Sequence, residues 1–315
     1  MPVSGGWTLT RASSYSTYVA VAARGVAQRG VIHSVFPAAA NIIFPGGFVL
    51  SLNAITSPRM PNGLQLSTPP GTFPFPVLRA GMPVLFGAQR LLIEAVDCSI
   101  DLSCCSDWDP HIERPAQLDM EIVAKNRDWL LAWCVRAPQA LLPVPQTGSP
   151  PGVPLHFCAM HEEKCSGYLS PRQGSPGGCQ VHNVRSMAQY LCGRGVGLTP
   201  TGDDILAGWM AVNWLLYGPL TWFLEACQQI VAVAKQQTHL LSQCWLSYAA
   251  TGDVATPIKA LLDALTKEDD AQLAASMEAV LSMGATSGRD LIQGIMLGLV
   301  GHAIHNENLI HRHSA

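Results

Sequence analysis

The chain has 315 residues, of which 48% are hydrophobic and 13% charged, and its formal net charge is −3. This length is enough for one large domain or for two of ordinary size. The small net charge, without a dense run of Lys or Arg, argues against nucleic acid as a partner. No uninterrupted apolar run reaches the length of a membrane span, so no membrane segment is expected.

The low share of charged residues predicts that other subunits cover much of the surface, in a homo-oligomer or a larger complex. The alternative is a compact chain whose surface is polar and rich in Ser, Thr and Gln. No basic N-terminal region precedes an apolar block, so no secretory signal is expected. The ten cysteines are then expected to be reduced thiols in a cytoplasmic protein.

Residues 1–115 are predicted to form a mainly β domain. Ser13 or Ser14 is predicted to cap a short helix that reaches Val26. Beyond this helix, β-branched and aromatic runs are separated by proline and glycine turns. They predict strands over residues 31–36, 41–44, 48–52, 63–67, 82–86 and 91–102. Short strands at this spacing are typical of a barrel or a curled sheet.

Two turns in this half depend on glycine. Gly46-Gly47 predicts a hairpin turn between two strands. Asn62-Gly63 predicts a tight turn in which the backbone needs a positive φ, a conformation that glycine adopts without steric cost.

Residues 116–315 are predicted to form a mainly α-helical domain, so the expected fold class is α+β. Apolar periodicity predicts helices over residues 119–135, 184–191, 203–217 and 290–305, and one long or two shorter helices over residues 221–250. Thr256 is predicted to cap a further helix with proline in its first turn, and Thr266 to start another. Residues 137–178, rich in proline, glycine and serine, are expected to form an irregular linker.

The most distinctive stretch is Gly-Arg-Gly-Val-Gly-Leu-Thr-Pro-Thr-Gly-Asp-Asp at residues 193–204. Glycines let a backbone turn tightly and approach a ligand closely. A helix that starts directly after such a loop aims its unpaired N–H groups at whatever the loop holds. Small anions are held in this way, so the loop is a candidate active-site loop. A nucleotide is not predicted, because Asp203 stands where a Walker lysine would follow Gly202.

Residues 284–296 repeat this pattern with one residue deleted. Thr199 corresponds to Thr286 and Asp204 to Asp290, and in both copies a glycine and hydroxyl turn leads into a helix with Asp in its first turn. We expect the two helix N-termini to converge on one anionic ligand. The alternative is that both copies are ordinary helix starts, capped by Thr and Asp.

The predicted site draws on both copies of the pattern. Its candidate catalytic residues are Asp203, Asp204 and Asp290. Its candidate anion-binding residues are Gly195, Gly197, Thr199, Thr201, Gly202, Thr286, Ser287, Gly288 and Arg289. Gly208 and Gly294 also correspond, and they are expected to let the two helix backbones pack closely. Thr238 and Ser242, one helical turn apart, are able to face the same site.

Carboxylates at an anion site raise a difficulty, since Asp203 and Asp204 repel an anion unless a proton or a metal intervenes. In the functional interpretation one of them binds Mg²⁺, acts as a base or orients another group. In the structural interpretation Asp203 caps the helix and Asp204 anchors the loop through backbone N–H groups. No cofactor is predicted apart from this Mg²⁺.

A zinc site is the other metal hypothesis. The spacings within one irregular segment suit zinc at Cys158, His161, Cys179 and His182. However, the segment has no Cys-x-x-Cys pair, and a chain with ten cysteines and ten histidines produces such clusters by chance. Chance is therefore the preferred explanation.

The two glycine loops resemble those of the AllH-like family, long catalogued as a domain of unknown function. The resemblance depends on Gly-Val-Gly-Leu-Thr-Pro-Thr-Gly-Asp-Asp at 195–204 and Gly-Ala-Thr-Ser-Gly-Arg-Asp at 284–290. Ser-Val-Phe at 34–36 and Pro-Asn-Gly at 61–63 fit its N-terminal half. The similarity covers the chain from about residue 31 onwards.

This resemblance implies a subunit of an oxamate carbamoyltransferase, an enzyme of anaerobic allantoin breakdown. That enzyme splits oxalurate with phosphate into oxamate and carbamoyl phosphate, and its companion subunits include an acyl-CoA-synthetase-like protein. Two functions are therefore expected. The chain binds a small anionic ureide or carbamoyl phosphate within the complex, or it assembles or gates the complex without catalysing, its glycine loops being tight helix-packing turns.

Overall fold

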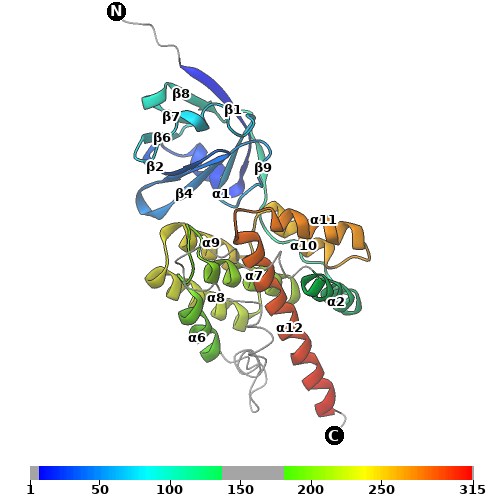
Figure 1. Ribbon diagram of the computed structural model, residues 1–315. Coiled ribbons are helices and arrows are strands. Elements are labelled where there is room, and N and C mark those ends of the chain that lie inside the picture. Colours follow the sequence, from blue (N-terminus) through cyan, green and yellow to red (C-terminus); the bar gives the residue numbers. More distant parts are fainter. Residues whose placement is uncertain (1–6, 137–180, 314–315) are drawn as a thin grey trace, which may run out of the picture. The chain divides into compact units, whose positions relative to one another are not determined.

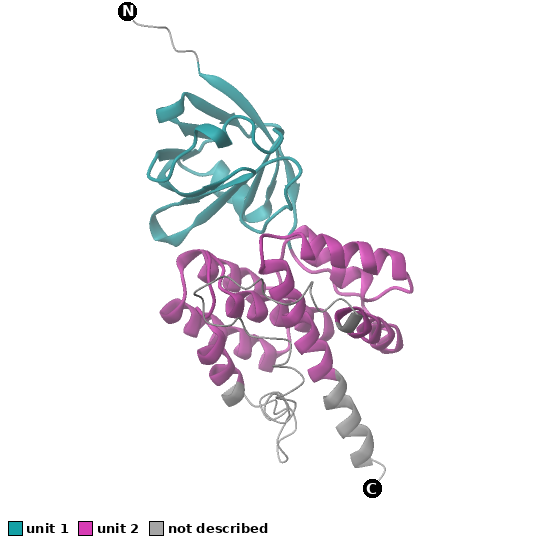
Figure 2. Ribbon diagram, viewed as in Figure 1, with its two compact units in different colours: residues 1–110 teal, residues 111–315 magenta. Residues whose placement is uncertain are grey.

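The computed structural model describes the backbone of residues 7–136 and 181–313 and the side chains of residues 7–134 and 184–302. The chain divides into two compact units, Met1–Pro110 and His111–Ala315, coloured separately in Figure 2. The first is a β-barrel and the second is helical, which confirms the predicted α+β class. None of the helices in the described part of the chain has both the length and the apolar character needed to cross a membrane.

The first unit is a barrel in which eight strands form a closed ring. They are connected in the order β5-β4-β3-β2-β6-β7-β8-β1, and the pairing of β1 with β5 closes the ring, while β9 extends the sheet beside β1. Closure leaves the ring without unpaired edges. The strands, visible in Figure 1, are β1 Thr8–Ser16, β2 Gln28–Phe36, β3 Ala39–Ile43, β4 Val49–Asn53, β5 Gly63–Leu66, β6 Pro83–Gly87, β7 Arg90–Ile93, β8 Cys98–Asp101 and β9 Ser106–Trp108.

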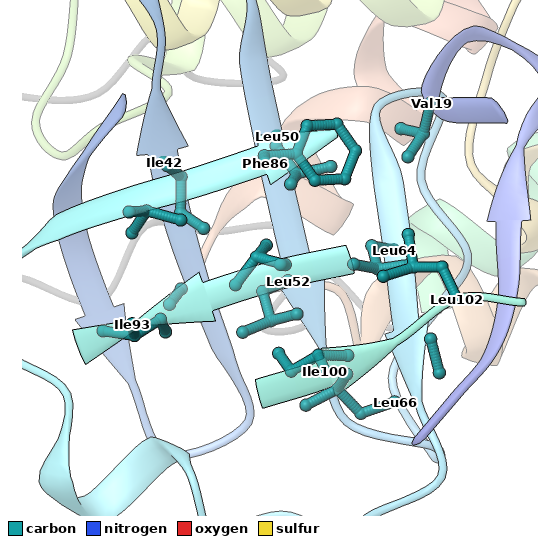
Figure 3. Packing of buried hydrophobic residues seen from close by; sticks show 14 of the residues in the cluster. Val19, Ile42, Leu50, Leu52, Leu64, Leu66, Phe86, Ile93, Ile100 and Leu102 are labelled. Atoms are coloured by element: carbon teal, nitrogen blue, oxygen red, sulfur yellow. The ribbon is translucent and has the colours of Figure 1, made fainter. Parts of the chain in front are cut away.

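Apolar side chains from many strands fill the interior of the barrel. Figure 3 shows part of this cluster, and its members Ile42, Leu52, Leu64, Phe86 and Ile100 are all buried. Burying one such side chain fully stabilises a fold by about 1.5–3 kcal/mol. The core therefore connects strands that are far apart in the sequence.

The structure corrects the prediction for the first 30 residues. Residues 8–16 form β1, because they pair with β5, β8 and β9. The predicted short helix exists as α1, Thr17–Arg24, and its N-cap is Ser16, whose hydroxyl accepts from the Val19 N–H at 3.2 Å. Ser13 and Ser14 lie in the strand, so the predicted cap was wrong.

The two predicted glycine turns have different outcomes. Gly46 and Gly47 have φ angles of 83° and 84° in the turn between antiparallel β3 and β4, which confirms the hairpin. Neither Asn62 nor Gly63 has a positive φ, so that prediction was wrong. Glycine is needed there for space instead, because a Cβ on Gly63 would lie 2.8 Å from the Met60 carbonyl oxygen.

The second unit contains the predicted helices, with corrected ends. The segment 221–250 forms two helices. The N-cap residue of α10 is Ala255 and not Thr256. The N-cap residue of α11 is Asp269, so Thr266 does not start that helix. The expected linker, residues 137–178, lies outside the described residues. The helices are α2 Met120–Arg136, α6 Val181–Leu191, α7 Thr201–Tyr217, α8 Thr221–Gln237, α9 Leu240–Ala250, α10 Thr256–Ala264, α11 Asp270–Leu281 and α12 Ser287–His313.

Helix α7 is the central helix of this unit, buried along most of its length and packed against α6, α8, α9, α10 and α12. Its contact with α12 is a close crossing of backbones. A Cβ on Gly208 would lie 2.1 Å from the Leu291 carbonyl oxygen, and a Cβ on Gly294 would lie 2.0 Å from the Ile205 carbonyl oxygen. Only glycine fits at both positions, as the sequence predicts.

Replacing Gly208 or Gly294 by alanine is expected to lower the free energy of unfolding by about 1–3 kcal/mol, because the added methyl group overpacks a backbone contact. Chemical denaturation of the full chain, followed by its helical circular dichroism signal, measures this change. The control is Ala232→Gly at an exposed position of α8, where losing alanine costs about 1 kcal/mol. Glycine variants as stable as the parent would contradict the close crossing.

Candidate functional site

The candidate site is built from two junctions in which a helix, a glycine loop and a second helix follow one another. In the first, α6 leads through residues 192–200 into α7, and in the second α11 leads through residues 282–286 into α12. Each second helix has a glycine in its first turn that lies against the end of the first helix. A Cβ on Gly202 would lie 2.0 Å from the Leu191 carbonyl oxygen, and one on Gly288 would lie 2.0 Å from that of Val280. The two junctions therefore share one packing plan.

Glycine conformation shapes the first loop as the sequence predicts. Gly193, Gly195 and Gly197 have φ angles of 71°, 118° and 98°. A Cβ on Gly195 would also lie 2.6 Å from the backbone nitrogen of Thr201. In the second loop Gly284 has a φ of 60°. Side chains at these positions would strain the backbone, so each loop depends on its glycines.

The two loops meet, as predicted. The Thr199 Oγ1 atom lies 2.9 Å from Ser287 Oγ, a hydrogen bond that joins residues 88 positions apart. Helices α7 and α12 therefore begin at the same end of their contact, and their first-turn carboxyls, Asp204 and Asp290, are brought near each other. Only 7% of Asp204 and 6% of Asp290 is exposed, and each has a buried Oδ2 atom without a hydrogen-bond partner.

Hydroxyl groups from both loops hydrogen-bond to these two carboxyls. Asp204 interacts with Thr199 of its own loop and with Ser287 of the other. Asp290 interacts with Thr286 of its own loop and with Thr201 of the other. Each carboxyl therefore faces one hydroxyl from each loop.

Burial is the main influence on the protonation of this carboxyl pair. It raises the pKa of Asp204 well above the ordinary value, and the charges of Asp290 and Asp203 raise it further, while the hydroxyls act in the opposite direction. Burial also raises the pKa of Asp290, to about 6, although the Arg289 charge and the hydroxyls lower it. Burial therefore makes both carboxyls harder to ionise than an exposed aspartate, and Asp290 loses its proton near pH 6.

Most of the backbone N–H groups of the first helical turns, from residue 202 in α7 and from residue 288 in α12, are used within the protein. Gly202 donates to the Arg194 carbonyl, and both Asp203 and Asp204 donate to Pro200. In α12 the N–H groups of Arg289 and Asp290 both donate to the Thr286 carbonyl. Side-chain hydroxyls and carboxyls, rather than these N–H groups, are the polar groups that the converging helix starts offer to a ligand.

These bonds also correct the predicted correspondence between the loops. The carbonyl that receives the first-turn N–H groups belongs to Pro200 in one copy and to Thr286 in the other. Thr286 therefore occupies the position of Pro200, not that of Thr199, and Ser287 corresponds to Thr201. Because Thr201 and Ser287 both stand three residues before the buried Asp, alignment on the helix starts would have found this pairing.

Asp203 has a different environment from its neighbour Asp204. Its Oδ1 accepts from the Gly193 N–H at 2.9 Å, and its Oδ2 accepts from the Thr238 hydroxyl. The N-cap of α7 is Pro200, with no side-chain cap, so the expectation that Asp203 caps this helix was wrong. Asp203 instead anchors the start of the loop to the end of α8. Ser242 also contacts the loop, donating to the Leu198 carbonyl at 3.3 Å.

The remaining predicted residues lie around the edge of the loops. Gly195 and Gly197 are exposed, and Arg289 is half-buried with its guanidinium donating to the Ala285 carbonyl at 3.3 Å. Within the described residues no group of three His, Cys, Asp or Glu side chains is arranged to hold a metal ion. Mg²⁺ at Asp203 and Asp204 stays a prediction. The zinc hypothesis falls outside the described side chains, which do not include Cys158, His161, Cys179 and His182.

Comparison with known proteins covers both units. A family model described as the oxamate carbamoyltransferase subunit AllH matches residues 191–299, a range that contains both glycine loops. A second model, the AllH family N-terminal domain, matches residues 11–107, which span most of the barrel. No match was found among solved structures.

Asp203→Ala is expected to lower the free energy of unfolding by about 1–3 kcal/mol, because the Gly193 N–H loses its acceptor. Thr238→Val should also destabilise the chain. The double variant should lose less than the sum of the two, since both changes break one network. Chemical denaturation of the four proteins measures this coupling. Strictly additive losses would show that Asp203 and Thr238 do not act together.

Asp204→Asn is expected to reduce the dependence of stability on pH. The folded carboxyl holds its proton above the ordinary pKa of 3.8, so the folded state binds more protons and stability falls as pH rises through that interval. For Asp290 the fall ends near pH 6, and the raised pKa of Asp204 changes stability in the same direction. Besides the hydroxyls, two charged side chains act on this pair of carboxyls, Asp203 on Asp204 and Arg289 on Asp290.

The measurement is the free energy of unfolding at pH 5 and pH 8. The parent should lose more stability between these values than Asp204→Asn, which is neutral at both. Ser282→Ala, which removes an exposed hydroxyl at the end of α11 and no ionisable group, serves as control. An equal loss in the parent and in Asp204→Asn would mean that Asp204 is ionised throughout.

Proposed function

The chain belongs to the AllH family, and we propose that it acts as a subunit of an oxamate carbamoyltransferase that binds a small oxyanion where α7 and α12 begin. In this proposal the ligand is a ureide such as oxalurate, phosphate or a product of their reaction, and the pathway is allantoin breakdown. The other subunits supply the rest of the active site.

The observation that carries this proposal is the buried carboxyl pair with its shared hydroxyls. An ionised aspartate would repel an oxyanion, but burial raises the pKa of Asp204 and so favours its protonated form, which is able to donate a hydrogen bond to the ligand. Thr199 and Ser287 lie on the same side, and since one of their hydroxyls donates to the other, at most one of the two is left to donate to a ligand. Donors that are fixed in a water-poor site stabilise negative charge more strongly than donors in water.

Asp290 suits a complementary role. With a pKa of about 6 it is able to accept a proton near neutral pH, the property of a general base. Cleavage of a ureide by phosphate requires proton movement at the nitrogen that leaves the carbamoyl group. In the proposed mechanism Asp204 and the hydroxyls hold the oxyanion, and Asp290 exchanges a proton with the reacting group.

A second function is favoured by a specific observation and is kept as the alternative. The N–H groups of residues 202–204 and 288–290 are satisfied internally, and Gly208 and Gly294 join the helices by close packing. This is what a non-catalytic subunit requires if it assembles or gates the complex. In that case the glycine loops serve only to turn the chain tightly.

An assay of the reconstituted complex separates the two functions. Asp204→Ala and the pair Thr199→Val/Ser287→Ala should each lower phosphate-dependent formation of carbamoyl phosphate by at least about 100-fold, the size of effect seen when one oxyanion donor is removed. Ser282→Ala should leave it unchanged. Size-exclusion chromatography of each variant with its partner subunits should show an intact complex.

Full activity with Asp204→Ala would remove the catalytic function and favour the assembly function. If instead the variant chains no longer join the complex, while their own helical content is normal, the loops serve assembly.

A further inference from the structure

A polar cleft opens in the wall of the barrel, on residues that the proposed function does not use. It measures about 170 Å³ and is partly open to solvent. Pockets for drug-sized ligands measure about 300–1,000 Å³, so this cleft suits a ligand of few atoms. Strands β1 and β9, the end of β4 and the segment 59–65 contribute to it. Its lining residues are Ser14, Tyr15, Ser16, Asn53, Arg59, Met60, Gly63, Gln65 and Trp108.

Gln65 holds part of the cleft wall in place. Its side-chain nitrogen donates to the carbonyls of residues 54, 55 and 57. Its Oε1 accepts from the Ser14 hydroxyl and from Arg59 Nε, each at 3.3 Å. An amide oxygen has two lone pairs, so Gln65 has no acceptor left for a ligand. Its role is to position Ser14 and Arg59.

Two other buried side chains of the wall have a donor hydrogen without an acceptor among the described residues. Ser16 is fully buried, and its Oγ accepts from the Val19 N–H at 3.2 Å, which leaves its own hydrogen unused. Asn53 is 5% exposed and donates one amide hydrogen to the Ser51 carbonyl at 2.9 Å, which leaves the other unused. Buried donors rarely stay unpaired in a folded protein, so the wall suits an acceptor from outside the chain.

The charge of the cleft is positive. Arg59 is the one charged residue among those that line it, and no carboxylate belongs to the lining. Ser16 is also the N-cap of α1, and a helix N-terminus has a partial positive charge. Trp108 adds an indole N–H, a group that only donates, and both Trp108 and Met60 are half-buried apolar side chains. Donors and a positive charge beside an apolar surface suit an anion with an apolar part.

We infer that this cleft binds the carboxylate of a short organic acid, whose oxygens accept from Arg59, Ser16 and Asn53. The apolar part of the acid lies against Met60 and Trp108. A guanidinium matches the planar geometry of a carboxylate, which favours this group over a neutral amide and over a tetrahedral anion without an apolar part. The inference goes beyond the proposed function, because the cleft lies within the first unit and does not depend on a ligand where α7 and α12 begin.

The test is a titration of the full chain, isotope-labelled at its tryptophan nitrogens, with propionate. Trp108 lines the cleft, so its indole NMR signal, assigned with Trp108→Phe, should shift in a saturable way. The signal of Trp214 in the second unit should stay in place. Propionamide, which has the same shape without the charge, should bind at least about ten-fold more weakly, because it loses the charge-assisted bond to Arg59. Inorganic phosphate that bound as tightly as propionate would overturn the assignment of a carboxylate.

Arg59→Gln is expected to weaken propionate binding at least about ten-fold, and its exposed position means that the fold is retained. Arg59→Lys, which keeps the charge but not the planar fork, should lose less. The control is Arg29→Gln, which removes the same charge from an exposed position of β2 outside the cleft and should leave binding unchanged. Equal effects of Arg59→Gln and Arg29→Gln, or no saturable shift of the Trp108 signal, would overturn the inference, with water alone then meeting the buried donors.

Discussion

The contact on which the helical unit depends is the crossing of α7 and α12 at Gly208 and Gly294. Because no side chain separates the two backbones there, the helices start close together. That closeness brings the Thr199 hydroxyl to Ser287 and buries Asp204 and Asp290. The pKa values of the two carboxyls are then raised mainly because burial disfavours their charged forms. One steric constraint therefore determines both the geometry of the site and its electrostatics.

Adjacent residues in this site have separate roles because of helix geometry. Successive side chains of an α-helix point about 100° apart, so Asp203 and Asp204 face different neighbours. Asp203 reaches Gly193 and Thr238 and fixes the loop, whereas Asp204 faces the hydroxyls of the α12 junction. The sequence shows two equivalent carboxylates, and only their surroundings distinguish an anchor from a candidate functional group.

Much of the site could be predicted because its signal is local and repeated. The second glycine loop was found from the first, and Gly208 and Gly294 were found from the same repeat. The roles of individual residues depend on contacts far along the chain, such as Asp203 with Thr238, and no local pattern encodes them. Burial, which decides whether Asp204 carries a proton, is likewise a property of the packed helices.

The barrel shows the same limit. Strands with continuous apolar runs, such as β4, could be predicted from their own residues. In contrast, β1 is a polar segment that becomes a strand only because β5, β8 and β9 pair with it. The predicted cap at Ser13 or Ser14 was misplaced for this reason. A strand that ends at residue 16 fixes where α1 begins, so the N-cap is Ser16.

The reciprocal crossing has a consequence for how the site changes during evolution. The crossing of α7 and α12 is held together by main-chain atoms and glycines. The polar groups of the candidate site lie at the starts of these two helices, one turn away from the crossing. Substitutions at Asp203, Arg289 or the loop hydroxyls therefore leave the crossing itself intact. In a repeated frame of this kind one half is free to change its charge while the other preserves the fold, and the two halves differ in this way at Asp203 and Arg289.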